Sequence, residues 1–311
     1  MDTEHIRLDV TGPVARITLD APGRNALSIR MQTEIRAALA ALADDPRVRV
    51  LVIDGAGGAF CSGAALDGLG GGDASGNANA NANANANANA NDNGSDDANG
   101  RDGGGESLGQ AVAAQMDALS NPMIREIRAF PHPVVSVVAG AAAGAGASLA
   151  LAADVTLAGE SGFFLFPFVP KLGLVPDLGA NWTLVNRLGE ARAMGLALMG
   201  GRLTATRAAE WGLIWQAVPD DALAEATNTM CAALAAAPPG MAGALRGLFA
   251  EARQSGFDPL LDREARQQAG HLDSPAFAEG RRAFLEKRAP VFATGDGGPP
   301  GDRAERPEKA G

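Results

Sequence analysis

Cysteine and histidine, which supply thiol and imidazole chemistry and most zinc ligands, are scarce in this chain. The 311 residues include two cysteines and three histidines. Cys61 and Cys231 are too few for a disulfide framework and lack the spacing of metal ligands, so two free thiols in a core are expected. His5, His132 and His271 are scattered along the chain, which disfavours a zinc site and a histidine-centred nucleophile. The sequence therefore predicts no metal site.

Positive charge is also in short supply. Lysine and arginine number 26 against 36 aspartates and glutamates, so the formal net charge is −10. A nucleic-acid partner is not expected for such a chain. His5, Arg7 and Asp9 interrupt the opening residues, so no signal peptide is expected and a cytoplasmic location is predicted. With 46% apolar residues, the chain can bury a full core in one large or two small domains.

Two segments lack the large apolar side chains that folding requires. Residues 68–105 contain seven successive Asn-Ala pairs and then a run of glycine and aspartate, and residues 293–311 are rich in glycine, proline and charge. Neither segment can bury enough surface to offset the entropy lost on ordering. We therefore predict a disordered insert at 68–105, a disordered tail at 293–311, an α/β core over residues 1–200 and a helical region over 201–292.

Strand patterns come first in the chain and helix patterns come last. Apolar residues alternate over residues 6–10 and 15–19 around a Thr-Gly-Pro turn, which predicts a β-hairpin. Ser28 is a candidate helix N-cap, and residues 47–54 and 155–157 have strand composition. Beyond Asp177 we predict helices over residues 182–188, 191–199, 205–211, 222–236 and 275–288.

Residues 134–154, VVSVVAGAAAGAGASLALAAD, predict a buried strand, a tight glycine-alanine turn and a helix N-terminus. Because the first N–H groups of a helix have no partner within it, such a turn can hold an enolate oxygen. An ordinary strand-helix core is the simplest alternative. Gly140 and Gly144 also form a GxxxG pair, but no aromatic belt accompanies them, which disfavours a membrane span. Leu149 occupies the third glycine position of a dinucleotide-binding loop, which disfavours that site.

A second loop of small residues follows the strand predicted at 47–54. Residues 57–66 read GGAFCSGAAL, and they expose backbone N–H groups beyond the carboxyl end of that strand, where open sheets bind ligands. Two backbone donors from the two loops can then converge on one oxygen. Either loop alone is also typical of an ordinary turn.

Five separated motifs occur in an order and spacing shared with a known family. They are NALS at residues 25–28, FCSGAAL at 60–66, the glycine-alanine turn at 140–149, GLVPDLG at 173–179 and AAEWGLI at 208–214. They resemble the crotonase, or enoyl-CoA hydratase/isomerase, superfamily, and within it the branch of 2-(1,2-epoxy-1,2-dihydrophenyl)acetyl-CoA isomerases. The resemblance implies an α/β spiral of strand-strand-helix units, with a C-terminal helical region that assembles trimers or pairs of trimers.

The resemblance also implies a chemistry. An acyl-CoA thioester carbonyl is expected between the backbone N–H groups of Ala64 and Ala145, so that an enolate can form. No separate cofactor is expected, because CoA is part of the substrate. Hydratases of the family use two glutamates, and Ser148 and Phe168 stand at those positions here, which disfavours ordinary hydration. The remaining carboxylate, Asp177, stands where isomerases of the family carry an aspartate, and we predict that it moves the proton.

Substrate contacts are implied for four residues. Arg24, Ala26, Ser62 and Phe168 are the candidates. Arg24 is expected to meet a CoA phosphate, and an exposed arginine that contacts only solvent is the simpler alternative. The chain departs from the family at Ala65, where an aspartate is common. We expect an isomerase of a ring-epoxide of phenylacetyl-CoA or of a Δ3-enoyl-CoA. A hydratase that uses another carboxylate and a non-catalytic CoA-binding protein are the alternatives.

From the residues alone, two of these positions have simpler interpretations. Asp177 follows a proline and precedes a helical run, which is also typical of a helix N-cap. Ser148 is expected to pack as a small helix residue near the acyl pocket, since no base is apparent for it. Core positions, with one or two near the acyl group, are expected for Phe163, Phe164, Phe166 and Phe168.

Overall fold

Two sheets form the centre of the molecule in the computed structural model, which describes residues 3–65 and 107–292. The predicted disordered insert and tail lie outside the described residues. In order across the larger sheet, the strands are β1 (Ile6–Thr11), β2 (Val14–Leu19), β3 (Val50–Gly55), β5 (Val134–Val138), β7 (Val155–Gly159) and β10 (Gln216–Val218). In the smaller sheet they are β4 (Ala59–Cys61), β6 (Ala141–Ala143), β8 (Phe163–Leu165) and β9 (Arg202–Thr204).

The chain passes from one sheet to the other in repeated strand-strand-helix units. β3 continues into β4, β5 into β6, and β7 into β8, and in each case the first strand lies in the larger sheet and the second in the smaller. The first of each pair joins a parallel ladder, whereas β1 and β2 pair antiparallel as the predicted hairpin. The parallel strands bring their carboxyl ends to one edge, which is the edge where β4 and β6 begin.

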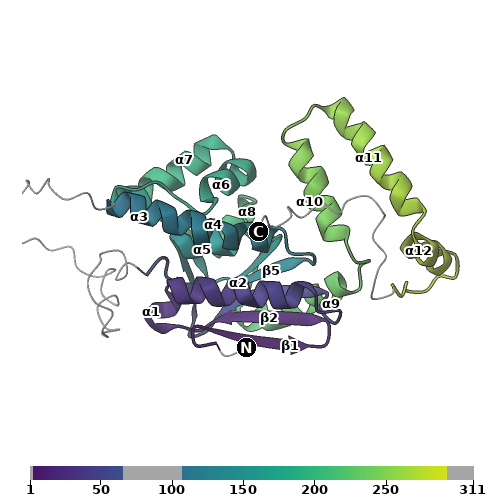
Figure 1. The fold of residues 1–311 in the computed structure, drawn as a ribbon, viewed down its shortest axis with the longest axis horizontal. Coiled ribbons are helices and arrows are strands. Elements are labelled where there is room, and N and C mark those ends of the chain that lie inside the picture. Colours follow the sequence, from purple (N-terminus) through teal and green to yellow (C-terminus); the bar gives the residue numbers. More distant parts are fainter. Residues whose placement is uncertain (1–2, 66–106, 293–311) are drawn as a thin grey trace, which may run out of the picture.

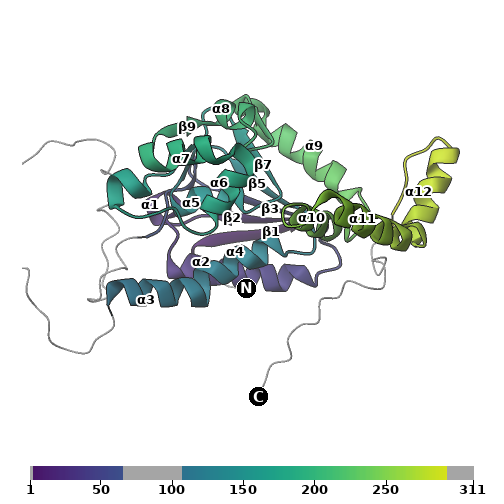
Figure 2. The same ribbon diagram turned by 90° about the horizontal axis from the view of Figure 1, so that it is seen from above.

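The earlier helices lie over the sheets, whereas the last helices of the chain extend away from them (Figures 1 and 2). Ser28 caps α2 as predicted, because its hydroxyl accepts a hydrogen bond from the Met31 amide. The helices before residue 200 are α1 (Pro22–Asn25), α2 (Ile29–Ala43), α3 (Leu108–Gln115), α4 (Asn121–Arg128), α5 (Ala145–Leu151), α6 (Ala180–Leu188) and α7 (Glu190–Met199). The later ones are α8 (Ala205–Glu210), α9 (Leu223–Ala235), α10 (Met241–Ala252), α11 (Phe257–Leu272) and α12 (Pro275–Leu285).

Two local predictions need correction. Residues 139–149 do not form one tight turn, because 141–143 add a strand, β6, to the smaller sheet before α5 begins. Helices α10 and α11 were not predicted as separate ranges. Strand β6 was missed because three residues are too few to show a period-two pattern. Helices α10 and α11 were missed because they have no buried side chains from which a helical stripe could be recognised.

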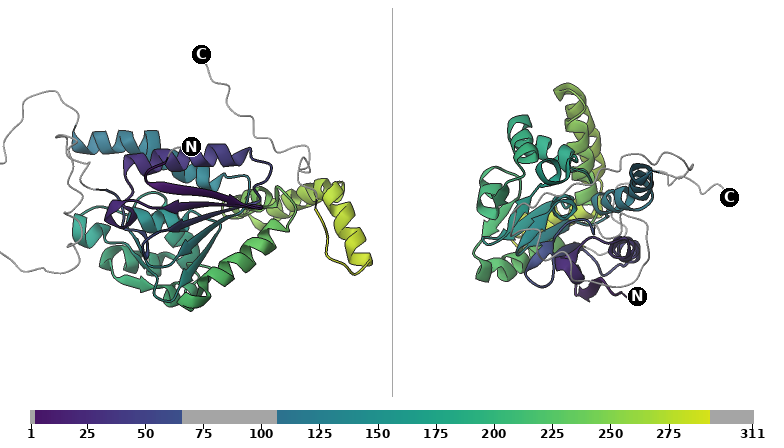
Figure 3. Two further views of the ribbon diagram at one scale, coloured as in Figure 1. Left: turned by 90° about the horizontal axis from the view of Figure 1, so that it is seen from below. Right: turned by 90° about the vertical axis from the view of Figure 1, so that its left-hand side faces the viewer.

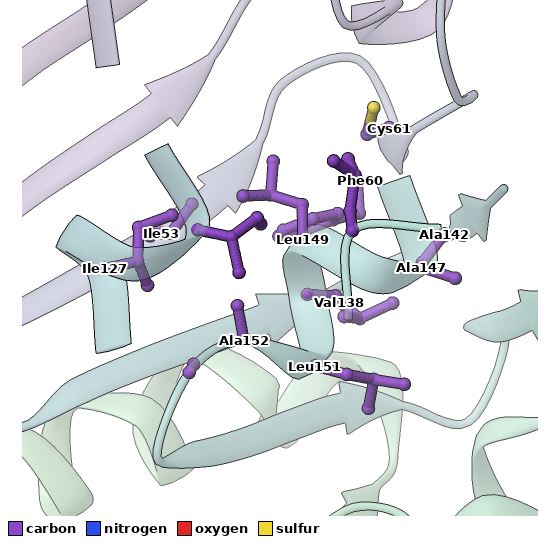
Figure 4. Close-up of a cluster of buried hydrophobic side chains, with 14 of the residues drawn as sticks. Ile53, Phe60, Cys61, Ile127, Val138, Ala142, Ala147, Leu149, Leu151 and Ala152 are labelled. Carbon is purple, nitrogen blue, oxygen red and sulfur yellow. The ribbon is translucent and has the colours of Figure 1, made fainter. Parts of the chain in front are cut away.

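The main core surrounds α5. All seven residues of this helix are buried, between strands of the larger sheet and the β4 loop. Figure 4 shows Ala147 and Leu149 among side chains that come from elements far apart in sequence, including Ile53, Phe60 and Val138. The burial of these apolar side chains is the main force that holds the site loops described below.

The last three helices project away from the two sheets (Figure 3). Of their residues only Ala283 is buried, and several large apolar side chains are exposed, among them Leu245, Phe249, Phe257 and Phe284. Among the helices that the structure describes, none is long and apolar enough to span a membrane.

Candidate active site

Two chain segments lie side by side at the end of β4. The amide of Leu27 donates to the carbonyl of Gly63 (2.8 Å), and the amide of Ser62 donates to the carbonyl of Arg24 (3.1 Å). The Ser62 hydroxyl donates to the carbonyl of Gly23 (2.6 Å). These bonds bring together four predicted site residues, which are Arg24, Ala26, Ser62 and Ala64.

Asn25 fixes this arrangement, and its role was missed in the sequence. Its side-chain amide donates to the carbonyls of Ala59 (3.0 Å) and Phe60 (3.3 Å), and its side-chain oxygen accepts from the amide of Ala21. The residue is buried and has φ +62°, a left-handed conformation that asparagine tolerates better than most residues. The available signal was its place as the first residue of the NALS motif at 25–28.

The two predicted donor loops approach each other backbone to backbone. A Cβ atom added to Gly63 would lie 3.1 Å from the carbonyl oxygen of Ala143 and 3.9 Å from the amide nitrogen of Ala145. Gly63 has φ +111° and Gly144 has φ +52°, which L side chains rarely adopt. Glycine at both positions therefore permits the close approach and the reversal of chain direction that precede each donor.

The amides of Ala64 and Ala145 are the two predicted donors. Ala145 is the first residue of α5, so its amide has no partner within the helix. Within the part of the chain that the structure describes, neither amide donates a hydrogen bond. Ala145 is buried whereas Ala64 is exposed, so one donor lies inside the body and the other at its rim.

Asp177 lies in the loop between the short helix η3 (Phe168–Leu172) and α6. Helix α6 begins at Ala180 with Gly179 as its N-cap and no side-chain cap, so the N-cap interpretation of Asp177 is wrong. The carboxyl is half-buried, and its Oδ1 is fully buried without a hydrogen-bond partner among the described residues. Burial raises the pKa of Asp177, opposed in part by a hydrogen bond from its own amide. Such a carboxyl is suited to accepting a proton.

Ser148 connects Asp177 to the donor loop. Its side chain is 2% exposed, and its hydroxyl donates to the carbonyl of Asp177 (3.0 Å). The same hydroxyl lies 3.4 Å from the carbonyl oxygen of Gly144, the residue before Ala145. The sequence identified Ser148 only as a small packing residue, because the bond joins positions 29 residues apart.

The phenylalanines divide between core and surface. Phe164, Phe166 and Phe168 are buried, as predicted. The ring edge of Phe168 would lie 3.8 Å from a Cβ added to Gly144, so this ring borders the donor loop. Phe163 is only partly buried, which corrects its prediction, and the guanidinium carbon of Arg202 lies 3.8 Å from the centre of its ring.

The cysteines have no part in this chemistry. Cys61 and Cys231 are both free and buried, as predicted. Burial raises the pKa of Cys61 to about 12, which keeps the thiol protonated and unreactive. Residues 3–65 and 107–292 contain no group of side chains that could hold a metal ion.

Comparisons with known proteins identify the family of this chain. The family described as enoyl-CoA hydratase/isomerase matches residues 9–91 and 100–295. A 1,2-epoxyphenylacetyl-CoA isomerase of Escherichia coli (strain K12) is 35% identical over 290 residues, which cover 93% of this chain and 98% of the relative. A probable enoyl-CoA hydratase of Rhodobacter capsulatus is 36% identical over 293 residues, 94% of this chain and 99% of the relative.

Solved structures have the same fold. The crystal structure of an enoyl-CoA hydratase from Polaromonas sp. JS666 matches with a TM-score of 0.75 and 29% identity, covering 93% of this chain and 99% of that chain. The α/β spiral with C-terminal helices, expected from the sequence motifs, is thereby confirmed.

Proposed function

Because the chain belongs to the enoyl-CoA hydratase/isomerase family, we propose that it is an acyl-CoA isomerase that moves a proton by way of a thioester enolate. The thioester oxygen binds between the amides of Ala64 and Ala145. The Asp177 carboxylate removes a proton from carbon and returns it to another carbon. The proposed substrate is 2-(1,2-epoxy-1,2-dihydrophenyl)acetyl-CoA, and a Δ3-enoyl-CoA is the alternative.

One observation carries the proposal most strongly. The buried Oδ1 of Asp177 has no hydrogen-bond partner among the described residues, and the cost of burying an unpaired carboxyl oxygen is hard to explain by stability alone. Two amides without acceptors in the neighbouring loops supply the matching electrophilic groups, each worth about 3 kcal/mol of transition-state stabilisation in comparable sites. Arg24, Ala26 and Ser62 lie in the two segments joined at the end of β4, and Phe168 borders the loop before Ala145; we propose that these four residues contact CoA and the acyl chain.

For ordinary hydration, the site lacks a pair of carboxylates that could act as acid and base toward water. Ser148 donates its hydroxyl to a carbonyl, and Phe168 has no polar group, so neither can activate water as a carboxylate does. The relative named as a probable enoyl-CoA hydratase keeps this activity as the second candidate. Addition of water to crotonyl-CoA by the purified protein would favour it.

The decisive experiment compares the wild type with Asp177→Asn on both proposed substrates. We expect Asp177→Asn to lower kcat by about a thousandfold, since a positioned general base contributes on the order of 10² to 10⁴. Asp44→Asn, which removes an exposed carboxylate at the end of α2, serves as the matched control and should keep full activity. Full activity in Asp177→Asn would remove this residue from the mechanism. CoA binding without conversion of any acyl-CoA would favour the non-catalytic alternative.

We also propose that the chain assembles as a trimer or a pair of trimers through α10, α11 and α12. These helices expose large apolar side chains, including Phe257 (75%) and Phe284 (82%), and monomeric proteins rarely leave so many such side chains exposed together. Light scattering coupled to size exclusion should give three or six times the chain mass. A monomer at micromolar concentration would contradict the proposal.

A further inference from the structure

The backbone of Asp177 is held more firmly than its side chain. The carbonyl of Asp177 accepts two hydrogen bonds, one from the amide of Ala180 (2.9 Å) and one from the hydroxyl of Ser148 (3.0 Å). The buried Oδ1 of the same residue has no partner within the described residues. The position of the carboxyl is therefore decided by the main chain that carries it.

The chain bends sharply just after Asp177. Leu178 has φ +50° although it carries a side chain, and Gly179 follows with φ +80°. A branched residue in the left-handed region persists only where its surroundings hold it there, and Leu178 is 7% exposed. The loop is held on one side by this packing and on the other by the Ser148 hydroxyl.

Ser148 belongs to the same rigid element as the buried oxyanion donor. It lies one helical turn after Ala145 in α5, a helix whose residues are all buried. Its hydroxyl also lies 3.4 Å from the carbonyl oxygen of Gly144, next to the Ala145 amide. One side chain thus spans from the donor loop to the loop that carries the carboxyl.

We propose that Ser148 is a positioning residue for proton transfer, which holds the Asp177 carboxyl in register with the Ala145 amide through the Asp177 carbonyl. The inference rests on the proposed isomerase function. Ser148 exchanges no proton with the substrate in this role. Its loss lets the loop at 177–179 shift relative to α5, and a displacement of about 1 Å in such a site can cost a hundredfold in rate.

The test measures kcat and KM for wild type, Ser148→Ala and Ser148→Cys, with Thr156→Val as the matched control. Thr156 is also buried and its hydroxyl donates to a carbonyl of α5, that of Ala150 (3.1 Å), at the end of the helix away from Ala145. We expect Ser148→Ala to lower kcat by about ten- to a hundredfold with KM changed less than about twofold. Ser148→Cys keeps a side-chain donor that is weaker and somewhat larger, and its kcat should fall between those of Ser148→Ala and wild type.

Thr156→Val should keep the wild-type kcat, and thermal unfolding of every variant separates loss of fold from loss of rate. Wild-type kcat in Ser148→Ala, or an equal fall of kcat in Thr156→Val, would overturn the role of Ser148. Either result would leave the proposed isomerase function standing. If Ser148→Ala does not fold, Ser148→Cys decides, and an unchanged kcat in that variant overturns the inference. A wild-type protein that converts no acyl-CoA would instead overturn the proposed function, and the role of Ser148 with it.

Discussion

Helices α5 and α11 differ in how much of their surface the rest of the chain covers. Every one of the seven residues of α5 is buried, whereas none of the sixteen residues of α11 is. α5 consists of alanine, glycine, serine and leucine, and its small side chains allow backbones to approach closely. α11 carries Phe257, Leu261 and Leu272 on an exposed surface.

The two helices therefore depend on different packing interactions. The site helix obtains its position from packing within one chain, so the distances among Ala145, Ser148 and Asp177 are set by the fold of a single subunit. The projecting helices have apolar surface that a single chain does not cover, and its burial requires another surface. A substitution at α5 is therefore expected to affect folding and catalysis, and one at α12 is expected to affect assembly.

The largest effect is predicted for Gly146→Val in α5. A Cβ atom at this position would lie 2.7 Å from the Cβ and 2.8 Å from the Sγ of Cys61, and closer still to the Cys61 carbonyl oxygen. Backbone atoms cannot move aside cheaply, so we expect a loss of about 3 kcal/mol or more in the free energy of unfolding. Urea denaturation and acyl-CoA turnover measure the two consequences.

Gly195→Ala in α7 is the control for this prediction. No atom lies within 4 Å of a Cβ built at that glycine. Because alanine has the higher helix propensity, the substitution should stabilise the protein by about 0.5 to 1 kcal/mol. Equal destabilisation by the two substitutions would contradict the close packing of α5 on the β4 loop.

The next largest effect is predicted for the assembly of the protein in solution. Phe284→Ser combined with Leu285→Ser removes two side chains of α12 that are 82% and 68% exposed. We expect the mass in solution to fall toward that of one chain, while the circular dichroism spectrum stays unchanged because the core loses nothing. An unchanged mass would show that this end of α12 lies outside the subunit contact.

The third prediction concerns the contact between α10 and the rest of the molecule. Arg246 of α10 forms an ion pair with Asp154 and donates to the carbonyl of His132 (2.9 Å), on the body of the molecule. Arg246→Met leaves Asp154, whose side chain is 27% exposed, without its charged partner and removes the hydrogen bond to the His132 carbonyl, so it should cost about 2 kcal/mol in thermal or urea unfolding. Arg207→Met, which breaks an exposed pair with Glu210, should cost less than about 1 kcal/mol.

The smallest effect is expected from pH. Since burial raises the pKa of Asp177, the acid limb of kcat/KM should lie above the usual aspartate value of about 4, and activity should fall tenfold per pH unit below it. The same shift affects stability in the opposite sense. The protonated carboxyl is favoured in the folded state, so its stabilising contribution is present at low pH and is lost as pH rises through the folded pKa.

Asp177→Asn tests this sign. The amide stays neutral at all pH values, so the stability advantage of Asp177→Asn over wild type should grow as pH rises through the folded pKa of Asp177. A constant difference between the two proteins, measured by urea denaturation across that range, would mean that the carboxyl has an ordinary pKa.

Much of the fold followed from local patterns. The hairpin at residues 6–19, the Ser28 cap and the five helical ranges after Asp177 were predictable because each depends on alternation, capping or helical composition within a few residues. The strands of the smaller sheet were not predicted, because three residues show no period. The family motifs identified the same small-residue loops that the structure brings together.

The sequence by itself determined which groups are available: two glycine-containing loops that can leave backbone amides without acceptors, one carboxyl after a proline, and no metal ligands in a useful spacing. Only the tertiary structure decided how they are used. It ruled out Asp177 as a helix cap, buried its Oδ1, and connected its carbonyl to Ser148 across 29 residues. Hydrogen bonds and backbone approaches between distant segments depend on how the sheets and α5 pack, and no local pattern of residues encodes that packing.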